Sequence, residues 1–387
     1  MTVHVLAVAD SDAYLKWAVH TLSALGPSLG GEPVEARAVV LRSPVLPTPA
    51  QVAAATAGST VGRTEVVSVW QLHRLLRRRP PDVLLVAATG PVAQVVGRLA
   101  QRARRRPALV TGLPGLALPA TAVGVRRRTW CDAFVVHSRA ERSAYGAAFA
   151  AAGTAPAVVL SHLPFFRPAG RDARAASGSS APVVFAAQPS VPAARHDRVR
   201  LLAGLAGVAA AGHDVVVKLR ATTGERQTHH EPHPYADLWE QEHARLGHPR
   251  ELLRFATGAM SDWLRPGATL VTVSSTAALE AIAAGVPTAL VADLGVADAL
   301  LNPPFAGSGL MTHLADLPAA LERGLPAPDP SWADEHGFHP EPSELPAALA
   351  RLVARSRASV LPAQRVPVPR RSVLRLVVPT TLAARAR

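Results

Sequence analysis

Three consecutive hydroxyl side chains, Ser274, Ser275 and Thr276, precede an alanine-rich stretch in which Glu280 is the only acid. Hydroxyls and free backbone N–H groups at the first turn of a helix bind phosphate. Glu280 comes one turn after Thr276 on the same face of such a helix, where a carboxylate can meet a ribose. The pattern predicts a nucleotide-sugar site; the alternative is that the hydroxyls only cap the helix.

Two carboxylates, Asp10 and Asp12, follow an apolar run at residues 2–9 that predicts a buried strand. Because α/β proteins bind ligands at the carboxyl ends of such strands, one of the two is our candidate base for an acceptor hydroxyl. Lys16 and Trp17, on the first turns of the next predicted helix, are candidates for binding the acceptor. The alternatives are that Asp12 caps this helix and that Trp17 belongs to the core.

Another predicted strand, residues 214–219, presents two positive charges at its end, Lys218 and Arg220. The chain has only two lysines, and Lys218 is one of them. Gln188 comes after another predicted strand, residues 183–187. We expect these three side chains to bind the donor, with the two cations offsetting the charge of a leaving phosphate.

A polar loop after Arg220 gathers three histidines, His229, His230 and His233, with glutamates between and before them. His233, which precedes a proline, is the candidate catalytic histidine of this group. The cluster also suggests a metal site, but it has no strict metal-binding spacing such as His-Glu-x-x-His, and we expect no metal. A loop that is merely solvated is the third interpretation.

Strand-like and helix-like stretches alternate along the chain, which predicts an α/β protein with doubly wound parallel sheets. Residues 167–182 are rich in Gly, Ser, Pro and Ala and lack large apolar side chains, which is typical of a linker. The sequence therefore predicts two Rossmann-like domains that face a cleft. They are an acceptor domain at residues 1–166 and a nucleotide-sugar domain at residues 183–355, followed by a basic tail at residues 356–387.

The composition narrows the class of protein. The net charge is +13, but only 4% of the residues are aromatic and no nucleic-acid motif is visible, so we expect no nucleic-acid partner. Cys131 is the only cysteine, which excludes an internal disulfide and favours the cytoplasm. No basic segment precedes the first apolar run, and no apolar stretch reaches about 20 residues, so we expect neither a signal peptide nor a membrane span.

The tail carries much of the positive charge and no acid. Its arginines are Arg357, Arg365, Arg370, Arg371, Arg375, Arg385 and Arg387. Such a segment can contact anionic lipid at the inner face of a membrane. The alternative is that the tail crosses back to the first domain.

The stretch SSTAALEAIAAGVPTALV, followed by NPPFAGSGL, resembles the C-terminal nucleotide-sugar motif of GT-B glycosyltransferases. It is most similar to the capsule-polysaccharide type, which uses CMP-activated Kdo or sialic acid. The shared features are a Ser-Ser-Thr helix start, a Glu within the helix, a Gly-x-Pro turn and a later Phe-containing stretch that ends in Gly-Leu. The close resemblance covers about forty residues.

This resemblance implies a GT-B enzyme that transfers a sugar from a nucleotide-sugar to a hydroxyl acceptor, with inversion, without metal and without a further cofactor. Relatives of the capsule type place a Lys-Pro-His-Pro signature, whose histidine contacts the donor phosphate, after the strand predicted here at residues 214–219. This chain has Lys218-Leu219-Arg220 instead, and His233 comes only later. The sequence therefore does not decide which histidine contacts the donor phosphate.

Other functions fit the same pattern. One is a UDP- or GDP-sugar transferase, and another is a nucleotide-sugar 2-epimerase, which shares the fold and needs acidic and histidine side chains around the sugar. A third is a non-catalytic protein that binds a glycan or serves as a scaffold.

Overall fold

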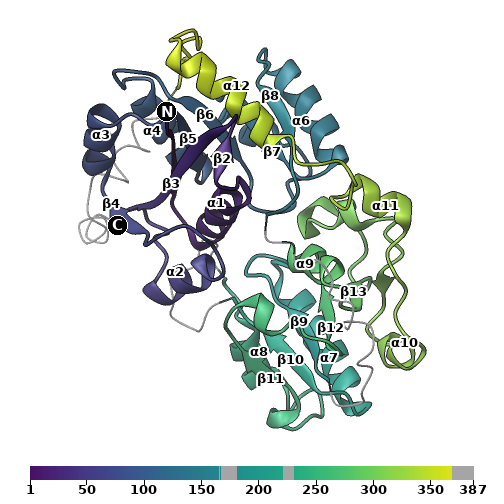
Figure 1. Ribbon diagram of the computed structural model, residues 1–387. Coiled ribbons are helices and arrows are strands. Elements are labelled where there is room, and N and C mark those ends of the chain that lie inside the picture. The colour runs from purple at the N-terminus through teal and green to yellow at the C-terminus, as the bar shows by residue number, and fades with distance from the viewer. Residues whose placement is uncertain (165, 167–180, 221–230, 368–387) are drawn as a thin grey trace. The chain divides into compact units, whose positions relative to one another are not determined.

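The computed structural model describes residues 1–164, 166, 181–220 and 231–367 of the 387-residue chain. It divides the chain into two compact units, Met1–Phe165 with His339–Arg387, and Phe166–Phe338 (Figure 1). The predicted linker lies almost entirely outside the described residues, as do His229, His230 and the tail from residue 368 onward.

The first unit is built on a mainly parallel sheet with the strand order β2-β3-β1-β5-β6-β7-β8, and β4 pairs with β3. The strands are β1 (Val3–Ala9), β2 (Ser28–Leu29), β3 (Glu32–Leu41), β4 (Glu65–Val67), β5 (Val83–Ala87), β6 (Ala108–Gly112), β7 (Ala133–Val136) and β8 (Ala157–Leu160). The helices are α1 (Asp12–Ala24), α2 (Pro49–Thr56), α3 (Val69–Arg78), α4 (Gly90–Ala100), α5 (Ala122–Arg126), α6 (Arg139–Ala151) and α12 (Leu345–Arg357).

The second unit has a parallel sheet with the order β11-β10-β9-β12-β13-β14. Its strands are β9 (Val183–Ala186), β10 (Val215–Lys218), β11 (Arg254–Ala256), β12 (Thr269–Thr272), β13 (Thr288–Val291) and β14 (Met311–Thr312). Its helices are α7 (Arg195–Ala210), α8 (Tyr235–Glu242), α9 (Ala277–Ala283), α10 (Leu317–Arg323) and α11 (Pro330–Glu335), with 3-10 turns at Arg250–Leu252, Met260–Asp262, Asp298–Leu300 and Pro303–Phe305. The predicted pair of Rossmann-like parallel sheets is confirmed.

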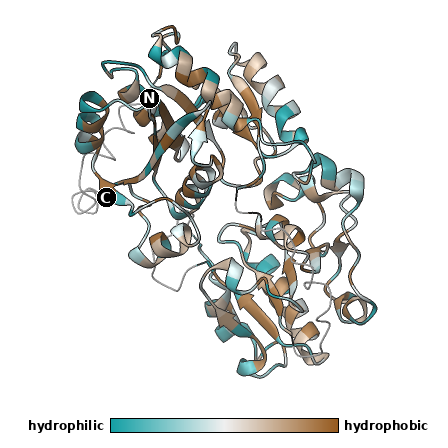
Figure 2. Ribbon diagram, viewed as in Figure 1, coloured by the Kyte–Doolittle hydropathy of each residue, from teal (hydrophilic) through white to brown (hydrophobic). Residues whose placement is uncertain are grey.

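Strand β1 shows how the sequence pattern builds the first unit. Val5 and Ala7 pack in one core cluster with residues of α1 and α12, whereas Leu6 and Val8 pack in another with residues of α3, α4 and α6. Because successive side chains of a strand point to opposite faces, an uninterrupted apolar run is what a sheet covered on both faces requires. Figure 2 shows the resulting apolar strands in both units.

Helix α12 belongs to the first unit, although the sequence analysis placed it in the second domain, which was expected to run to residue 355. Leu345, Leu349 and Val353 are buried against α1 and the strands of the first sheet. An amphipathic helix has an apolar face to bury, but its sequence does not say which sheet will cover it. The second unit therefore ends at Phe338.

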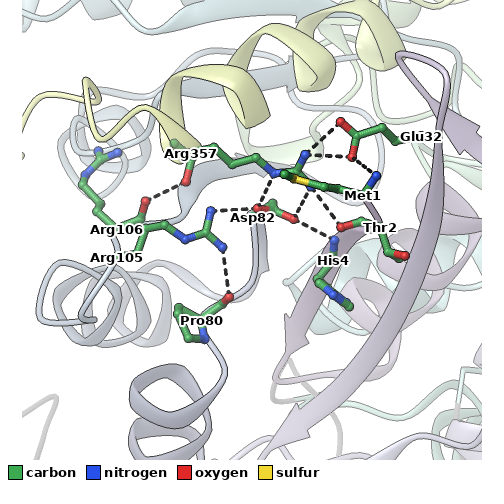
Figure 3. Close-up of polar contacts among 10 residues, drawn as sticks. Met1, Thr2, His4, Glu32, Pro80, Asp82, Arg105, Arg106 and Arg357 are labelled. Carbon is green, nitrogen blue, oxygen red and sulfur yellow. Dashed lines mark hydrogen bonds and ion pairs between the residues drawn. The ribbon is translucent and has the colours of Figure 1, made fainter.

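Ionic contacts fix the C-terminal end of α12 to the first unit (Figure 3). Arg357 donates to both Asp82 oxygens at 3.1 Å, to Glu32 Oε2 at 2.7 Å and to the Thr2 carbonyl at 2.9 Å. Arg105 Nη1 donates to Asp82 Oδ1 at 2.7 Å. Burial raises the pKa of Asp82, but hydrogen bonds from Arg357, the His4 N–H and Arg105 outweigh burial and hold it below its usual value.

The start of the predicted tail is part of this unit. Ser356 donates to the Arg106 carbonyl at 2.9 Å, and Val366 is buried in the core cluster that contains α3 and α4. The chain through Pro367 thus crosses back to the first unit, which was one of the two expectations for the tail. Within the described residues, no helix has both the length and the apolar character that spanning a bilayer requires.

Candidate functional site

Strand β9 is the point at which the strand order of the second sheet reverses, because β10 lies on one side of it and β12 on the other. The loops that leave the carboxyl ends of such strands diverge and leave a crevice where α/β proteins bind ligands. Gln188 follows β9, Ser274 follows β12, and Lys218 is the last residue of β10. Three predicted donor-binding residues therefore come from three adjacent strands at one edge.

Gln188 and Ser274 bind each other across this edge. The Ser274 N–H donates to Gln188 Oε1 at 3.0 Å, and Gln188 Nε2 donates to Ser274 Oγ at 3.1 Å. Ser274 Oγ in turn donates to the Leu300 carbonyl at 2.6 Å, and Ser274 is buried. These two polar side chains hold the loops after β9, β12 and β13 in one arrangement.

Ser275 and Thr276 differ in what their hydroxyls do. Ser275 Oγ accepts from the Ala277 N–H at 3.2 Å, so the capping interpretation applies to this residue. Thr276 is the N-cap of α9 but makes no side-chain cap hydrogen bond. Both are partly exposed, and so is Glu280, whose N–H donates to the Thr276 carbonyl at 3.2 Å one helical turn later.

Arg198, on α7, is fully buried (0% exposed) and binds the loop that follows β9 and the loop that follows β10. Its guanidinium donates to Glu231 at 2.6 Å, to the His233 carbonyl at 2.8 Å and to the Pro192 carbonyl at 2.8 Å. It also donates to the carbonyls of Gln188 and Pro189, and it lies over the Tyr235 ring at 4.7 Å from the ring centre. Two of these five hydrogen bonds hold the backbone of Gln188 and His233 in place.

His233 is partly exposed, and its backbone is fixed by Arg198. Lys218 is buried (8% exposed) and Arg220 is partly exposed. Both precede residues 221–230, which lie outside the described part of the chain. Among the described residues, no three His, Cys, Asp or Glu side chains gather as a metal site would require. Since His229 and His230 are outside this set, the metal interpretation of the full loop stays untested.

Strand β1 is the point at which the strand order of the first sheet reverses, because β3 lies on one side of it and β5 on the other. Asp10 follows β1 and is completely buried (0% exposed). Its carboxylate accepts from the Thr89 N–H at 3.1 Å and from the Thr89 hydroxyl, on the loop after β5. Burial raises the pKa of Asp10 to about 6, although the Thr89 hydrogen bonds and the Arg128 charge oppose the rise.

Asp12 and Lys16 lie on α1 next to Asp10 and are partly exposed, so both can meet a ligand. Asp12 is the first residue of α1; Ser11 is the N-cap and makes no side-chain cap bond. The Ser11 hydroxyl is buried and has no hydrogen-bond partner in the described part of the chain. An unsatisfied hydroxyl between the two carboxylates is the kind of group that a bound ligand or water completes.

Trp17 does not fit its predicted role. It is fully buried (0% exposed), and its Nε1–H donates to His137 Nε2 at 2.8 Å. Burial lowers the pKa of His137 to about 4, and its Nδ1–H donates to the Ser161 carbonyl at 3.0 Å. The prediction that Trp17 holds the acceptor is therefore wrong in this structure, and the alternative, a core residue, is correct.

Some residues of these sites were not singled out from the sequence. Thr89 is one of them, because nothing in the sequence around it marks it as the partner of Asp10. Arg128 is buried and donates to the Tyr14 hydroxyl at 2.9 Å and to the Ala88 carbonyl at 3.1 Å. Arg198 stands among other arginines in a helical sequence, so no local signal separates it from surface residues.

Two α/β units with parallel Rossmann-like sheets, each with polar side chains at the reversal point of its strand order, define a protein of the GT-B class. A family model described as "Putative glycosyltransferase (DUF6716)" matches residues 5–352, and the chain belongs to this family. A search of curated proteins finds no match to the sequence.

Solved structures of the same fold include a protein from Listeria monocytogenes titled as a putative UDP-N-acetylglucosamine 2-epimerase. It has 13% identity and a TM-score of 0.57, with 95% of this chain and 100% of that one covered. The S. aureus MnaA–UDP co-structure has 10% identity and a TM-score of 0.54, with 94% and 99% covered. Another UDP-N-acetylglucosamine 2-epimerase has 11% identity and a TM-score of 0.54, with 94% and 98% covered. At such identities the likeness shows a shared fold and nothing more.

Replacing Arg198 should destabilise the second unit strongly. We expect Arg198→Leu to lower its free energy of unfolding by about 3 kcal/mol or more, because Glu231 and the loop carbonyls lose their buried partner. Arg200→Leu, at an exposed position of the same helix, should change it by less than about 0.5 kcal/mol. Urea unfolding of both variants measures the difference, and equal effects would show that the buried guanidinium is dispensable.

The raised pKa of Asp10 predicts a specific pH dependence. The folded state binds the Asp10 proton up to about pH 6, whereas the unfolded chain loses it near 3.8. The stability that this proton contributes is therefore complete below 3.8 and lost as the pH rises through 6. Asp10→Asn abolishes this loss, so its unfolding free energy relative to wild type should rise by about 3 kcal/mol from acidic to neutral pH.

Asp82→Asn provides the control, because the pKa of Asp82 is lowered by folding. Its contribution is present above the unfolded pKa and lost as the pH falls, so the relative stability of this variant should change in the opposite direction. Urea unfolding followed by tryptophan fluorescence at a series of pH values measures both. A flat difference for Asp10→Asn would mean that this carboxyl titrates normally in the fold.

Proposed function

We propose that this protein transfers a sugar from a nucleotide-sugar donor to a hydroxyl acceptor, and that its second unit binds the donor. The observation that carries the proposal is the edge at which β9, β10 and β12 end. There Gln188 and Ser274 fix the crevice loops, and the partly exposed Ser275, Thr276 and Glu280 follow directly. Membership of a family described as glycosyltransferases gives the reaction class.

The donor phosphate is assigned to the hydroxyls of Ser275 and Thr276, and the ribose to Glu280. Lys218 comes two strand spacings away from Ser274, about 10 Å, which is within reach of a long cationic side chain across a phosphate. Together with Arg220 it offsets the negative charge that develops on the leaving group. In this proposal positive side chains fill the role of a metal ion, and His233 adds a hydrogen bond to the phosphate.

The identity of the nucleotide is a finer question. The resemblance of residues 274–310 to the capsule-polysaccharide type favours CMP linked to a nonulosonate such as sialic acid or Kdo. The S. aureus relative of the same fold was determined with UDP. A single phosphate needs less positive charge than a diphosphate, and the two cations at the end of β10 suit CMP.

The base that takes the acceptor proton is assigned to Asp12 in the first unit. Asp10 is completely buried and both its oxygens accept from Thr89, so its role is to fix the loop after β5. Asp12 is exposed enough to meet a hydroxyl, and Lys16 one turn later can orient the acceptor. Removal of the proton during direct displacement gives inversion at the anomeric carbon.

We also propose that the protein acts in the cytoplasm and that the basic tail contacts anionic lipid there. The described part of the tail is held on the first unit, because Val366 is buried in the core cluster that contains α3 and α4. A truncation that tests lipid binding should therefore begin after Pro367 rather than at residue 356.

A nucleotide-sugar 2-epimerase is the second candidate function, because the solved epimerase structures share the fold over nearly their full lengths. An epimerase would break and re-form the bond between carbon 2 of the sugar and its hydrogen. Incubation of UDP-N-acetylglucosamine with the protein in D₂O would then place deuterium at carbon 2, which NMR detects. A transferase leaves this position unlabelled.

Substitutions at the start of α9 separate phosphate binding from capping. We expect Thr276→Ala to weaken binding of the preferred nucleotide by about tenfold with little change in stability, because one charge-assisted hydrogen bond is lost and no cap is removed. Ser275→Ala should also lower stability by about 1 kcal/mol, because its hydroxyl caps Ala277. Calorimetric titration with CMP, UDP and GDP measures affinity, and Thr276→Ser is the matched control that keeps the hydroxyl. Unchanged affinity in Thr276→Ala would remove this residue from the site.

Asp12→Asn tests the base. Turnover should fall by at least about a hundredfold while the affinity for the donor stays within about twofold, because the carboxylate acts on the acceptor and not on the nucleotide. Release of free nucleotide in the presence of acceptor glycans measures turnover. If turnover and donor affinity fell together, Asp12 would be a binding residue, and the assignment of the base would be wrong.

A further inference from the structure

The first unit has an open pocket of about 710 Å³ at the C-terminal end of α4. One side is formed by Gln94, Arg98, Gln101 and Arg102, and the other by the chain segment Gln364–Pro367. The volume lies within the range of sites that hold small molecules. Helix α4 begins next to Thr89 and extends about 15 Å, so the pocket lies away from the edge that holds Asp10.

The charge of this pocket is entirely positive. Arg98, Arg102 and Arg365 line it, and no lining residue is acidic. The chain from residue 83 to residue 131 contains no aspartate or glutamate at all. Arg98 lies in the last turn of α4 and Arg102 in the turn that follows the helix. Guanidinium groups that line one pocket repel each other. An anion between them would remove this repulsion.

The neutral side chains hold the pocket in shape. Gln94 is buried and its Nε2–H donates to the Pro367 carbonyl at 2.8 Å, which fixes the C-terminal segment. Gln101 Oε1 accepts from Arg106 Nε at 3.1 Å and from the Gln364 N–H at 3.3 Å. Two glutamines from α4 and the turn after it thus attach the segment that carries Arg365.

Gln101 also carries an unsatisfied donor. Its Nε2 is buried and has no hydrogen-bond partner among the described residues. A buried donor without a partner is unfavourable, so such a group usually marks a ligand or water that completes it. The negative end of the α4 dipole would account for arginines at this end of the helix. It does not account for the concave shape or for the unsatisfied amide.

We propose that this pocket binds a phosphate-bearing anion, with Arg98, Arg102 and Arg365 as its cations and the Gln101 amide as a neutral donor. Guanidinium groups bind phosphate oxygens in pairs, and three of them around one pocket suit a pyrophosphate or a phosphate ester. The phosphate is either a soluble anion or the headgroup of an anionic lipid. The proposal does not rest on the assignment of the donor site.

The test uses the full-length chain at fixed salt concentration and two probes, sodium pyrophosphate in calorimetry and vesicles with or without phosphatidylglycerol in co-sedimentation. The pocket variant is Arg98→Ala with Arg102→Ala. The control is Arg77→Ala with Arg78→Ala, which removes the same charge from exposed positions at the C-terminal end of α3 in the same unit. Nucleotide affinity is measured in both variants to monitor the separate site in the second unit.

The pocket variant should lose about tenfold or more in affinity for one of the two probes, while the control loses less than about twofold. A loss confined to pyrophosphate identifies a soluble anion, and a loss confined to phosphatidylglycerol vesicles identifies a lipid headgroup. Nucleotide affinity should be unchanged in both variants. Equal losses in the two variants would show nonspecific attraction to a basic surface, and absence of binding to either probe would likewise overturn the proposal.

Discussion

The second unit depends on a buried cation. Taking a guanidinium out of water costs several kcal/mol, and the cost is offset only when charge and hydrogen bonds are provided in full. Arg198 has Glu231, four backbone carbonyls and the face of Tyr235 around it. Glu231 and the four carbonyls lie in loops, and Tyr235 is the first residue of α8. The arginine therefore supplies hydrogen bonds that these loops do not obtain from a helix or a sheet. The loops that follow β9 and β10 are consequently held in one conformation.

In both units a side chain connects the loops that follow two adjacent strands, but the two units use different polar groups. In each, a side chain from the loop after the strand at the reversal point of the sheet binds the loop after an adjacent strand. In the first unit the tie is a carboxylate, Asp10 with Thr89, and an exposed acid and a lysine follow it. In the second it is an amide and a hydroxyl, Gln188 with Ser274, and further hydroxyls follow it. A unit with acids suits removal of a proton from an acceptor, and a unit with hydroxyls and cations suits an anionic donor.

The sequence predicted the fold well because strands buried on both faces leave long apolar runs, and residues 2–9, 183–187 and 214–219 each contain a strand. Gly285 follows the C-cap of α9, where its φ of 69° favours a residue without a side chain. Ser138 caps α6 by accepting from the Glu141 N–H, whereas the Glu141 carboxylate accepts from the N–H groups of His137 and Ala117, a contact that no local pattern predicts.

The sequence failed to predict features that depend on packing between residues far apart in the chain. Trp17 is on a helix beside two candidate acids, and only the sheet beneath it decides that it is core. Helix α12 has an apolar face that either unit could cover. The role of Arg198 depends on partners in loops 6 to 35 residues away along the chain, so no local pattern distinguishes it from an exposed arginine.

A crystal structure of the protein with its preferred nucleotide tests the central claim most directly. The account predicts that the phosphate lies against the hydroxyls of Ser275 and Thr276 at the carboxyl edge of β9 and β12, with Gln188 and Ser274 unmoved. A nucleotide found elsewhere in the chain, or at this edge with its base and not its phosphate at Thr276, would contradict it.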